Sequence, residues 1–229
     1  MNRPGGPEIS VIIAVRDGER YLDEAIRSVY GQTHTDLELI VVDDGSTDST
    51  ATIAASYPAA RLLRLPASGV SSARNAGLAA ARGTVIAFLD ADDVWHPHKL
   101  SVQLAVLRRH PEVDHVTCRI ELFLQAGHKR PAALREELFR QPQPGLIPSA
   151  LCVRRTACDR VGPFDPRLGS SEDTDWFLRA ADAGLKHKAL EDVLVRKRVH
   201  PGCASLRPPA GPSALTAVVG ASLRRRRGA

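Results

Sequence analysis

The stretch that decides the fold is Val85-Ile-Ala-Phe-Leu-Asp-Ala-Asp-Asp93, in which a short apolar run ends abruptly in acidic residues. A short apolar run bounded by polar residues is typical of a strand buried on both faces of a sheet. The pattern occurs once earlier, where the strand-like segment Leu37–Val42 runs into Asp43 and Asp44. Both acidic clusters follow a predicted buried strand, which predicts a polar site at one edge of a sheet.

Strand and helix signals alternate through the first half of the chain. Strands are expected at residues 9–15, 37–42, 61–65 and 85–89, and helices at residues 19–30, 47–56, 71–81 and 97–110. This order predicts a mainly parallel sheet with right-handed crossovers and flanking helices. Ligands of such sheets bind beyond the C-terminal ends of the strands, where both acidic clusters fall.

The second half of the chain is less regular. Strands are expected at residues 113–118 and 147–154, one or two more at residues 186–199, and a helix at residues 172–183. From Arg207 onward Pro, Ala, Gly and Arg dominate, which predicts a loose tail with at most a weak helix from Ser213 to Leu223. We therefore expect a first half at residues 1–115, a second half of the same domain at residues 116–205, and a basic, flexible tail at residues 206–229.

The bulk properties indicate a globular protein. The 229 residues, 43% of them hydrophobic and 25% charged, suffice for one well-buried domain. The chain contains no run of 18 apolar residues. Its first apolar run, Ile9–Val15, is short, ends at Arg16 and Asp17 and lacks a flanking small-residue cleavage site, which disfavours a signal peptide. The four cysteines form no C-x-x-C pair, which favours reduced, buried thiols. We expect a cytoplasmic protein, either free or at the inner face of the membrane.

The charge balance indicates anionic partners without choosing among them. A net charge of +5 suits phosphorylated ligands, anionic lipid or nucleic acid. The densest basic run, Arg224–Arg227, is more typical of a solvated tail, and peripheral contact with anionic lipid is the alternative. Aromatic residues make up only 4% of the chain, so we expect no nucleic acid partner.

The acidic cluster at the end of the fourth strand could bind a metal. Asp90 and Asp92 would share one face if strand geometry continued through them. Paired carboxylate oxygens suit Mg²⁺ or Mn²⁺, which usually bind the phosphates of a ligand as well. The alternative is an acidic loop that caps the next helix, and these residues alone leave both interpretations open.

The cluster after the second strand has a similar ambiguity. Asp43 and Asp44 could accept hydrogen bonds from a nucleotide base or ribose. On these residues alone, an Asx turn followed by a helix cap is the favoured alternative.

Two predicted helix starts complete the candidate site. Arg74 lies in the first turn of a helix whose N-terminus would face the site and favour anions, although a surface arginine is the alternative. Glu172 and Asp173 open a later helix, where they could supply a general base or merely complement the helix dipole.

In order and spacing, seven segments of the chain resemble glycosyltransferase family 2, whose members have the GT-A fold. These segments span roughly residues 8 to 205 and are Ser10–Val15, Asp36–Ser49, Gly69–Gly77, Phe88–Pro97, Val161–Asp165, Ser171–Arg179 and Arg198–Gly202. The resemblance implies an α/β fold of the GT-A type, with a Rossmann-like, mainly parallel sheet flanked by helices and a smaller mixed region on the acceptor side.

The resemblance also implies an activity. It implies an inverting transfer of sugar from a nucleoside-diphosphate sugar, which we expect to be a UDP-sugar, to an acceptor hydroxyl, with Mg²⁺ or Mn²⁺. The acceptor could be a glycan, a lipid-linked molecule or a small molecule, in polysaccharide or cell-envelope synthesis. By resemblance Asp173 is the general base. The implied donor-binding residues are Ala14, Val15, Asp17, Asp43, Asp44, Arg74 and Asp90, and the implied metal ligands are Asp92, Asp90 and His200.

Two positions depart from the family pattern, and both touch the donor pocket. The chain has Arg16-Asp17 where the family commonly has an aromatic residue followed by Asn, and Ala67 where Asn is common. These departures leave the base and the sugar open. The rival interpretations are a catalytically inactive GT-A nucleotide-binding or assembly module and a nucleotidyltransferase. The second is disfavoured because the first strand ends in Ala14–Asp17 rather than in a glycine-rich phosphate loop.

Overall fold

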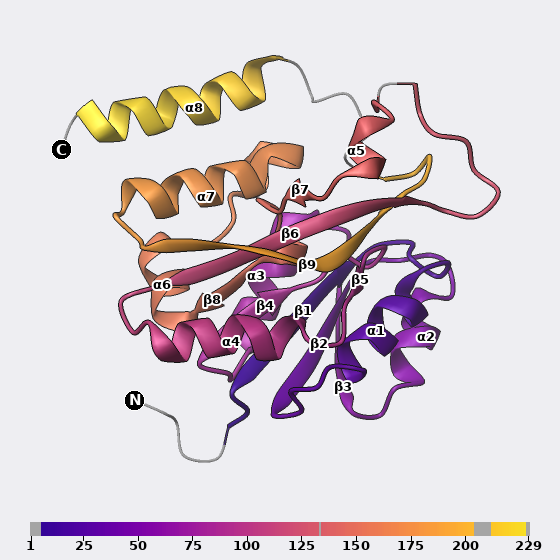
Figure 1. Ribbon diagram of the computed structural model, residues 1–229. Coiled ribbons are helices and arrows are strands. Elements are labelled where there is room, and N and C mark those ends of the chain that lie inside the picture. The colour runs from indigo at the N-terminus through magenta and orange to yellow at the C-terminus, as the bar shows by residue number, and fades with distance from the viewer. Residues whose placement is uncertain (1–5, 133, 204–211, 228–229) are drawn as a thin grey trace.

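A curled sheet runs through the centre of the protein, with helices on both of its faces (Figure 1). The computed structural model describes residues 6–132, 134–203 and 212–227. Within these residues nine strands form one sheet in the order β3-β2-β1-β4-β8-β6-β9-β5, with β7 beside β6. The strands are β1 (Ile9–Val15), β2 (Leu37–Asp44), β3 (Ala60–Leu65), β4 (Val85–Phe88), β5 (Val94–Trp95), β6 (His115–Leu124), β7 (Gln143–Pro144), β8 (Cys152–Arg154) and β9 (His187–Val199).

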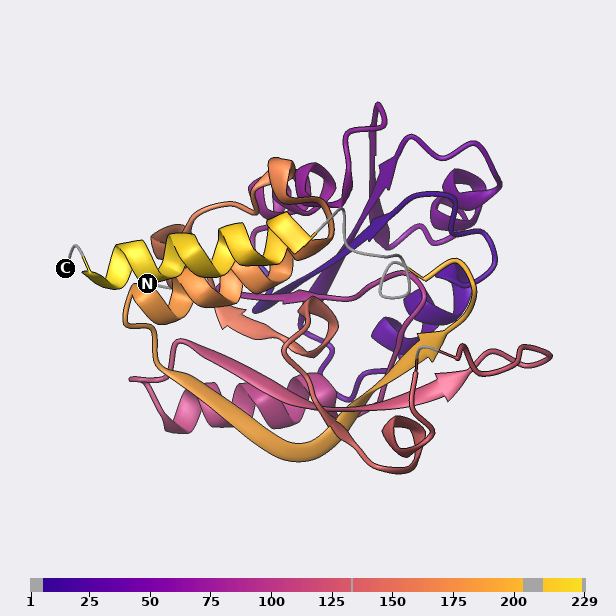
Figure 2. The same ribbon diagram turned by 90° about the horizontal axis from the view of Figure 1, so that it is seen from above.

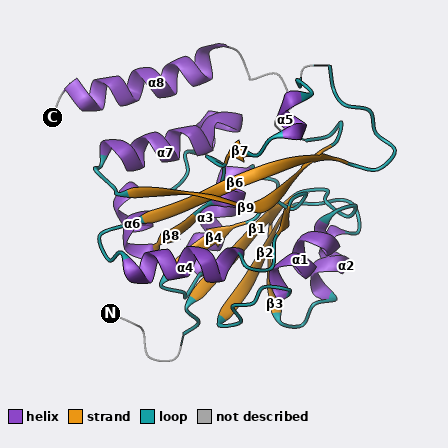
Figure 3. Cartoon of the chain, in the orientation of Figure 1, coloured by secondary structure: helices purple, strands orange, loops and turns teal. Residues whose placement is uncertain are grey.

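The helices connect these strands and cover the sheet (Figure 3). The α-helices are α1 (Leu22–Tyr30), α2 (Thr50–Ala55), α3 (Val70–Ala80), α4 (Lys99–Arg109), α5 (Glu137–Arg140), α6 (Arg155–Val161), α7 (Glu172–Asp182) and α8 (Pro212–Arg227), and the 3₁₀ helices are η1 (Pro148–Ala150) and η2 (Pro166–Ser171).

The sheet has a parallel part and a mixed part, as the sequence predicts. Strands β1, β2, β3 and β4 pair in parallel, with Ile9 opposite both Leu37 and Val85. Strand β8 then pairs antiparallel to β4 and to β6, so the mixed region begins at β8. All four parallel strands therefore end at one edge, which places the segments that follow them side by side.

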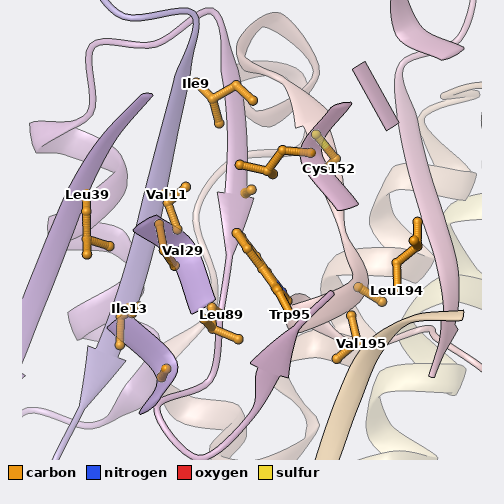
Figure 4. Packing of buried hydrophobic residues seen from close by; sticks show 14 of the residues in the cluster. Ile9, Val11, Ile13, Val29, Leu39, Leu89, Trp95, Cys152, Leu194 and Val195 are labelled. Atoms are coloured by element: carbon orange, nitrogen blue, oxygen red, sulfur yellow. The ribbon is translucent and has the colours of Figure 1, made fainter. Parts of the chain in front are cut away.

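Alternation along the strands creates two cores, one on each face of the sheet. On β1, Val11 and Ile13 point to the face covered by α1, α2 and α4, whereas Ile12 points to the face covered by α3, α6 and α7. Figure 4 shows part of the first core, with Trp95 packed among aliphatic side chains. Burial on both faces explains why these strands appear in the sequence as almost continuous apolar runs.

Helix α3 approaches β1 closely because it has a glycine at the contact. A Cβ atom on Gly77 would lie 2.4 Å from Ile12 Cγ2 and 3.3 Å from Val42 Cγ2. The absent side chain lets the helix lie on the sheet, and this holds the N-terminal end of α3 beside the acidic segments.

Of the tail predicted at residues 206–229, residues 212–227 form helix α8, which contains the weak helix expected from Ser213 to Leu223 and is longer. Residues 206–211, 228 and 229 lie outside the described residues. Figure 2 shows α8 lying along α7. The buried side chain of Val218 and three bonds to Asp182 hold it there: Ser222 Oγ at 2.9 Å, Arg225 Nε at 2.8 Å and Arg226 Nε at 2.7 Å. The carboxylate of Asp182 on α7 thus partly neutralises Arg225 and Arg226, which were expected to be solvated. Among the described residues, no helix is both long and apolar enough to traverse a bilayer.

Candidate functional site

The segments that follow the strands meet at one edge of the sheet. The acidic segment Asp90–Asp93 leaves β4, and His200 directly follows β9. Nε2 of His200 lies 3.0 Å from Oδ2 of Asp92, and the imidazole packs against the ring of Tyr21 with centroids 4.6 Å apart. A carboxylate oxygen and an imidazole nitrogen, both common metal ligands, therefore lie close together although their residues are more than 100 positions apart in the sequence.

Arg74 joins two acidic segments in the interior of the site. Its guanidinium is buried and donates to Oδ1 of Asp90 at 2.8 Å and to Oε1 of Glu172 at 2.7 Å. It also lies 5.5 Å above the ring of Phe164. Burial alone would lower the pKa of Arg74, but the charges of Asp90 and Glu172 outweigh that effect and raise it. The predicted donor-binding arginine is therefore an internal bridge and not a surface side chain.

Asp173 lies at the start of α7, next to this bridge. Its Oδ1 accepts a hydrogen bond from the backbone N–H of Thr174 at 2.6 Å. Burial raises the pKa of Asp173, with Arg74 opposing and Asp90 adding to the shift. A raised pKa makes Asp173 a stronger proton acceptor than an ordinary aspartate.

Asp93 anchors the acidic segment to β9. Its fully buried carboxylate accepts from Ser149 Oγ at 2.8 Å and from the backbone N–H of Arg198 at 3.1 Å, and Lys197 Nζ lies 3.7 Å away. Burial raises the pKa of Asp93 to about 7 although the charge of Lys197 acts in the opposite direction. This carboxylate therefore fixes the backbone that presents Asp92.

The predicted nucleotide-binding residues lie at the same edge, around the ends of β1 and β2. Ala14 pairs with Val42, and Val15 pairs with Asp43. Beyond β1, Asp17 has a left-handed backbone with a φ of 50°. Its Oδ1 accepts from the N–H of Thr47 at 2.8 Å, which ties the two loops together.

The carboxylates of Asp43 and Asp44 also shape the backbone at this edge. Asp43 accepts from the N–H of Ser46 at 2.9 Å, which is the turn that the sequence favours. Asp44 accepts from the N–H groups of Ser68 and Gly69 at 2.7 and 2.8 Å and so fixes the loop before α3. Both carboxylates therefore hold loops in place through hydrogen bonds to backbone N–H groups. Their contact with a nucleotide stays a prediction.

Residues 10–159 match the sequence profile described as Glycosyl transferase family 2. The chain belongs to this family. A relative from Nostoc sp., named as an uncharacterised glycosyltransferase, is 36% identical over 209 residues, which are 84% of this chain and 65% of that protein. The chain thus spans slightly less than two thirds of that relative's length.

Solved structures show the same fold. S. aureus TarS in complex with UDP-GlcNAc is similar with a TM-score of 0.77 and 22% identity, covering 95% of this chain and 66% of that one. The mannosyltransferase PcManGT from Pyrobaculum calidifontis, in complex with GDP-Man and Mn²⁺, is similar with a TM-score of 0.66 and 19% identity, covering 97% and 74%. The predicted α/β fold of the GT-A type is confirmed.

The three predicted metal ligands of this family 2 member do not form a ready cluster. No group of three His, Cys, Asp or Glu residues in the described chain is arranged to hold an ion. Asp92 and His200 converge, whereas Oδ1 of Asp90 accepts a hydrogen bond from Arg74, and the role of Asp90 as a metal ligand stays a prediction. One carboxylate and one imidazole still fit a divalent ion, because Mg²⁺ and Mn²⁺ sites commonly take remaining ligands from water and substrate phosphates.

Several residues of the site were missed at the sequence level. Asp93 lies within the recognised segment Phe88–Pro97 and Lys197 directly precedes Arg198–Gly202, but neither residue had an assigned role. Glu172 was expected to supply a general base or to complement the helix dipole, and its bond to Arg74 was not expected. Ser149, whose Oγ accepts a hydrogen bond from the backbone N–H of Asp90 at 3.1 Å, had no signal in the sequence.

Proposed function

We propose that this protein transfers a sugar, with inversion, from a UDP-sugar to an acceptor hydroxyl, using a divalent cation and Asp173 as the general base. One observation carries the proposal. Arg74 connects Asp90, in the acidic segment that also carries Asp92, to Glu172 at the start of α7, which also carries Asp173. Family 2 membership supplies the reaction class.

The residues divide the work by position. Asp92 and His200 would hold the cation, which would neutralise negative charge on the diphosphate as it leaves. Asp173 takes the proton of the acceptor hydroxyl as its oxygen bonds to the anomeric carbon, on the face opposite the departing diphosphate. At the anomeric carbon the bond to the acceptor oxygen forms while the bond to the diphosphate oxygen breaks. The configuration at that carbon is therefore inverted.

Arg74 acts as a positioning residue in this proposal. Its guanidinium is buried against Asp90 and Glu172, so it fixes the acidic segment and the start of α7 relative to each other. Holding reacting groups at a fixed separation is a large part of catalysis, because it removes orientational entropy before the reaction.

The choice of UDP is supported by the likeness to a structure that contains UDP-GlcNAc, with a TM-score of 0.77. The structure with GDP-Man has a lower TM-score of 0.66. The edge formed by Ala14, Val15, Asp17, Asp43 and Asp44 is where the nucleotide would bind, beyond the ends of β1 and β2.

A thermal-shift screen of UDP-, GDP- and dTDP-sugars, each with and without Mn²⁺, tests the donor. A ligand at 100 times its Kd stabilises the folded state by about 2.7 kcal/mol, which raises the melting temperature measurably. We expect the largest shift for a UDP-sugar with Mn²⁺ and none for Mn²⁺ with free sugar. Equal shifts for every nucleotide sugar, or no shift at all, would overturn the donor assignment.

A further inference from the structure

Helix α8 carries an apolar stripe that faces away from the protein. Leu215, Val219 and Leu223 are 50%, 43% and 49% exposed. Their spacing of four residues places them along one side of the helix. Six large apolar side chains are exposed in the described chain, and three of them belong to this stripe. Single exposed apolar residues are ordinary, but a contiguous set on one helix marks a binding surface.

The orientation of the stripe is fixed by the inner side of the same helix. Val218 and Ser222 are buried against α7, and Ser222 Oγ donates to Asp182 at 2.9 Å. Figures 1 and 2 both place α8 beside α7 at the outer edge of the molecule. Because the inner side of α8 packs against α7, a rotation of α8 about its own axis that buried the stripe would break these contacts.

Positive charge surrounds the C-terminal end of the stripe. Residues 212–227 contain no Asp or Glu and end in the run Arg224–Arg227. Arg225 and Arg226 remain 36% and 57% exposed although both pair with Asp182. Arg160 adds a further exposed guanidinium, which donates to the backbone carbonyl of Ala183 at 3.1 Å and pairs with Asp114 at 3.5 Å. The single charge of Asp182 cannot neutralise both Arg225 and Arg226, so the end of α8 is cationic.

We propose that α8 docks this protein on an anionic membrane surface, with the stripe at the boundary of headgroups and acyl chains and the arginines against lipid phosphates. An apolar side flanked by arginine is the pattern of a helix that lies in the membrane interface. Charge complementarity selects this partner over a second copy of the chain, because the α8 of a second copy would bring the same arginines and no acidic residue.

Flotation with lipid vesicles tests the proposal on the full chain, without donor or metal, so its outcome is independent of the proposed function. The triple variant Leu215→Ser/Val219→Ser/Leu223→Ser removes the stripe and keeps every arginine. The matched control Tyr30→Ser/Leu146→Ser removes exposed apolar side chains elsewhere. Far-UV circular dichroism and the melting temperature establish that each variant is folded.

We expect the wild type and the control to float with vesicles containing phosphatidylglycerol, and to bind phosphatidylcholine vesicles at least about tenfold more weakly. The triple variant should lose at least about tenfold in binding to the anionic vesicles. Arg224→Glu should weaken binding and flatten its salt dependence. The proposal would be overturned if the wild type did not float with anionic vesicles, or if the triple variant bound them as strongly as the wild type. A concentration-dependent dimer, detected by sedimentation, that the triple variant abolishes would overturn it as well.

Discussion

Arg74 is the residue at which two segments of the candidate site meet, since its partners Asp90 and Glu172 lie 16 and 98 positions after it in the sequence. Replacing it by Met would leave both carboxylates without their cation. Removing one partner of a buried ion pair costs about 3–5 kcal/mol, because the remaining charge stays desolvated. We expect Arg74→Met to lower the free energy of unfolding by this amount in urea titrations.

Arg82→Met is the matched control for this substitution, because Arg82 also pairs with a carboxylate, that of Glu38, but is exposed. Exposed ion pairs contribute about 0–1 kcal/mol. If the two variants unfolded at the same urea concentration, Arg74 would not be the internal bridge that the geometry indicates.

A substitution of Asp173 tests the proposed general base and leaves the bridge from Arg74 to Asp90 and Glu172 in place. Asp173→Asn keeps the shape of the side chain and its contact with Thr174, but removes the proton acceptor. A positioned general base contributes about 10² to 10⁴ in rate, so kcat should fall by that factor while the affinity for the donor stays unchanged. Turnover with a competent acceptor and calorimetric titration with UDP measure the two effects. Asp159→Asn, at an exposed position on α6, should change neither.

At the scale of elements, the contact between α3 and β1 depends on the missing side chain of Gly77. A Cβ there would lie 2.4 Å from Ile12 Cγ2, well inside van der Waals contact. Overpacking of this kind costs about 1–3 kcal/mol even though alanine is the better helix former. We expect Gly77→Ala to lower the midpoint of urea unfolding.

Gly220 in α8 supplies the comparison, because the nearest atom to its added Cβ would be Arg224 Nη1 at an ordinary 3.5 Å. Gly220→Ala should therefore leave stability unchanged or raise it by up to about 1 kcal/mol. A stabilising Gly77→Ala would show that α3 can move away from the sheet without cost.

The strands could be predicted more closely than the helices. Strand β1 was predicted as residues 9–15 and has those bounds, because burial on both faces gives a continuous apolar signal. Helix α1 was expected from Glu19 but begins at Leu22. The N–H groups of Gly18 and Glu19 donate to Thr50 Oγ1 and Asp48 Oδ2, so these residues belong to a contact between loops about 30 positions apart. Such a partner cannot be read from local periodicity.

Separation along the chain also limited what could be predicted of the site and of α8. The family resemblance assigns Asp92 and His200 to one metal site, and in the structure Nε2 of His200 lies 3.0 Å from Oδ2 of Asp92. The bridge from Arg74 to Glu172 spans 98 positions, and its geometry depends on how α7 packs. Likewise, α8 has a weak local signal and is held by Asp182, which is 43 positions before Arg225.

For the molecule as a whole, His115 couples stability to pH from a site remote from the acidic cluster. Its ring is buried, stacks on His187 with centroids 4.7 Å apart, and leaves Nδ1 without a hydrogen-bond partner in the described chain. Burial, followed by the charge of His187, lowers the pKa of His115 to about 4. The ordinary pKa of an unfolded histidine is about 6.5.

Between these two values the unfolded chain binds more protons than the folded one, so stability rises with pH and is lost as the pH falls from about 6.5 to about 4. The shift corresponds to about 3 kcal/mol. Because carboxylates such as Asp165, whose pKa is lowered to about 2 by hydrogen bonds from Arg167, also weaken the fold in acid, the informative quantity is a difference between variants. We expect the free-energy difference between wild type and His115→Phe, from urea unfolding, to shift by about 3 kcal/mol in favour of the variant between pH 7.5 and pH 4. His98→Phe, which removes an exposed imidazole, should show no comparable shift. A difference that stays constant across this range would mean that His115 is protonated in the folded protein.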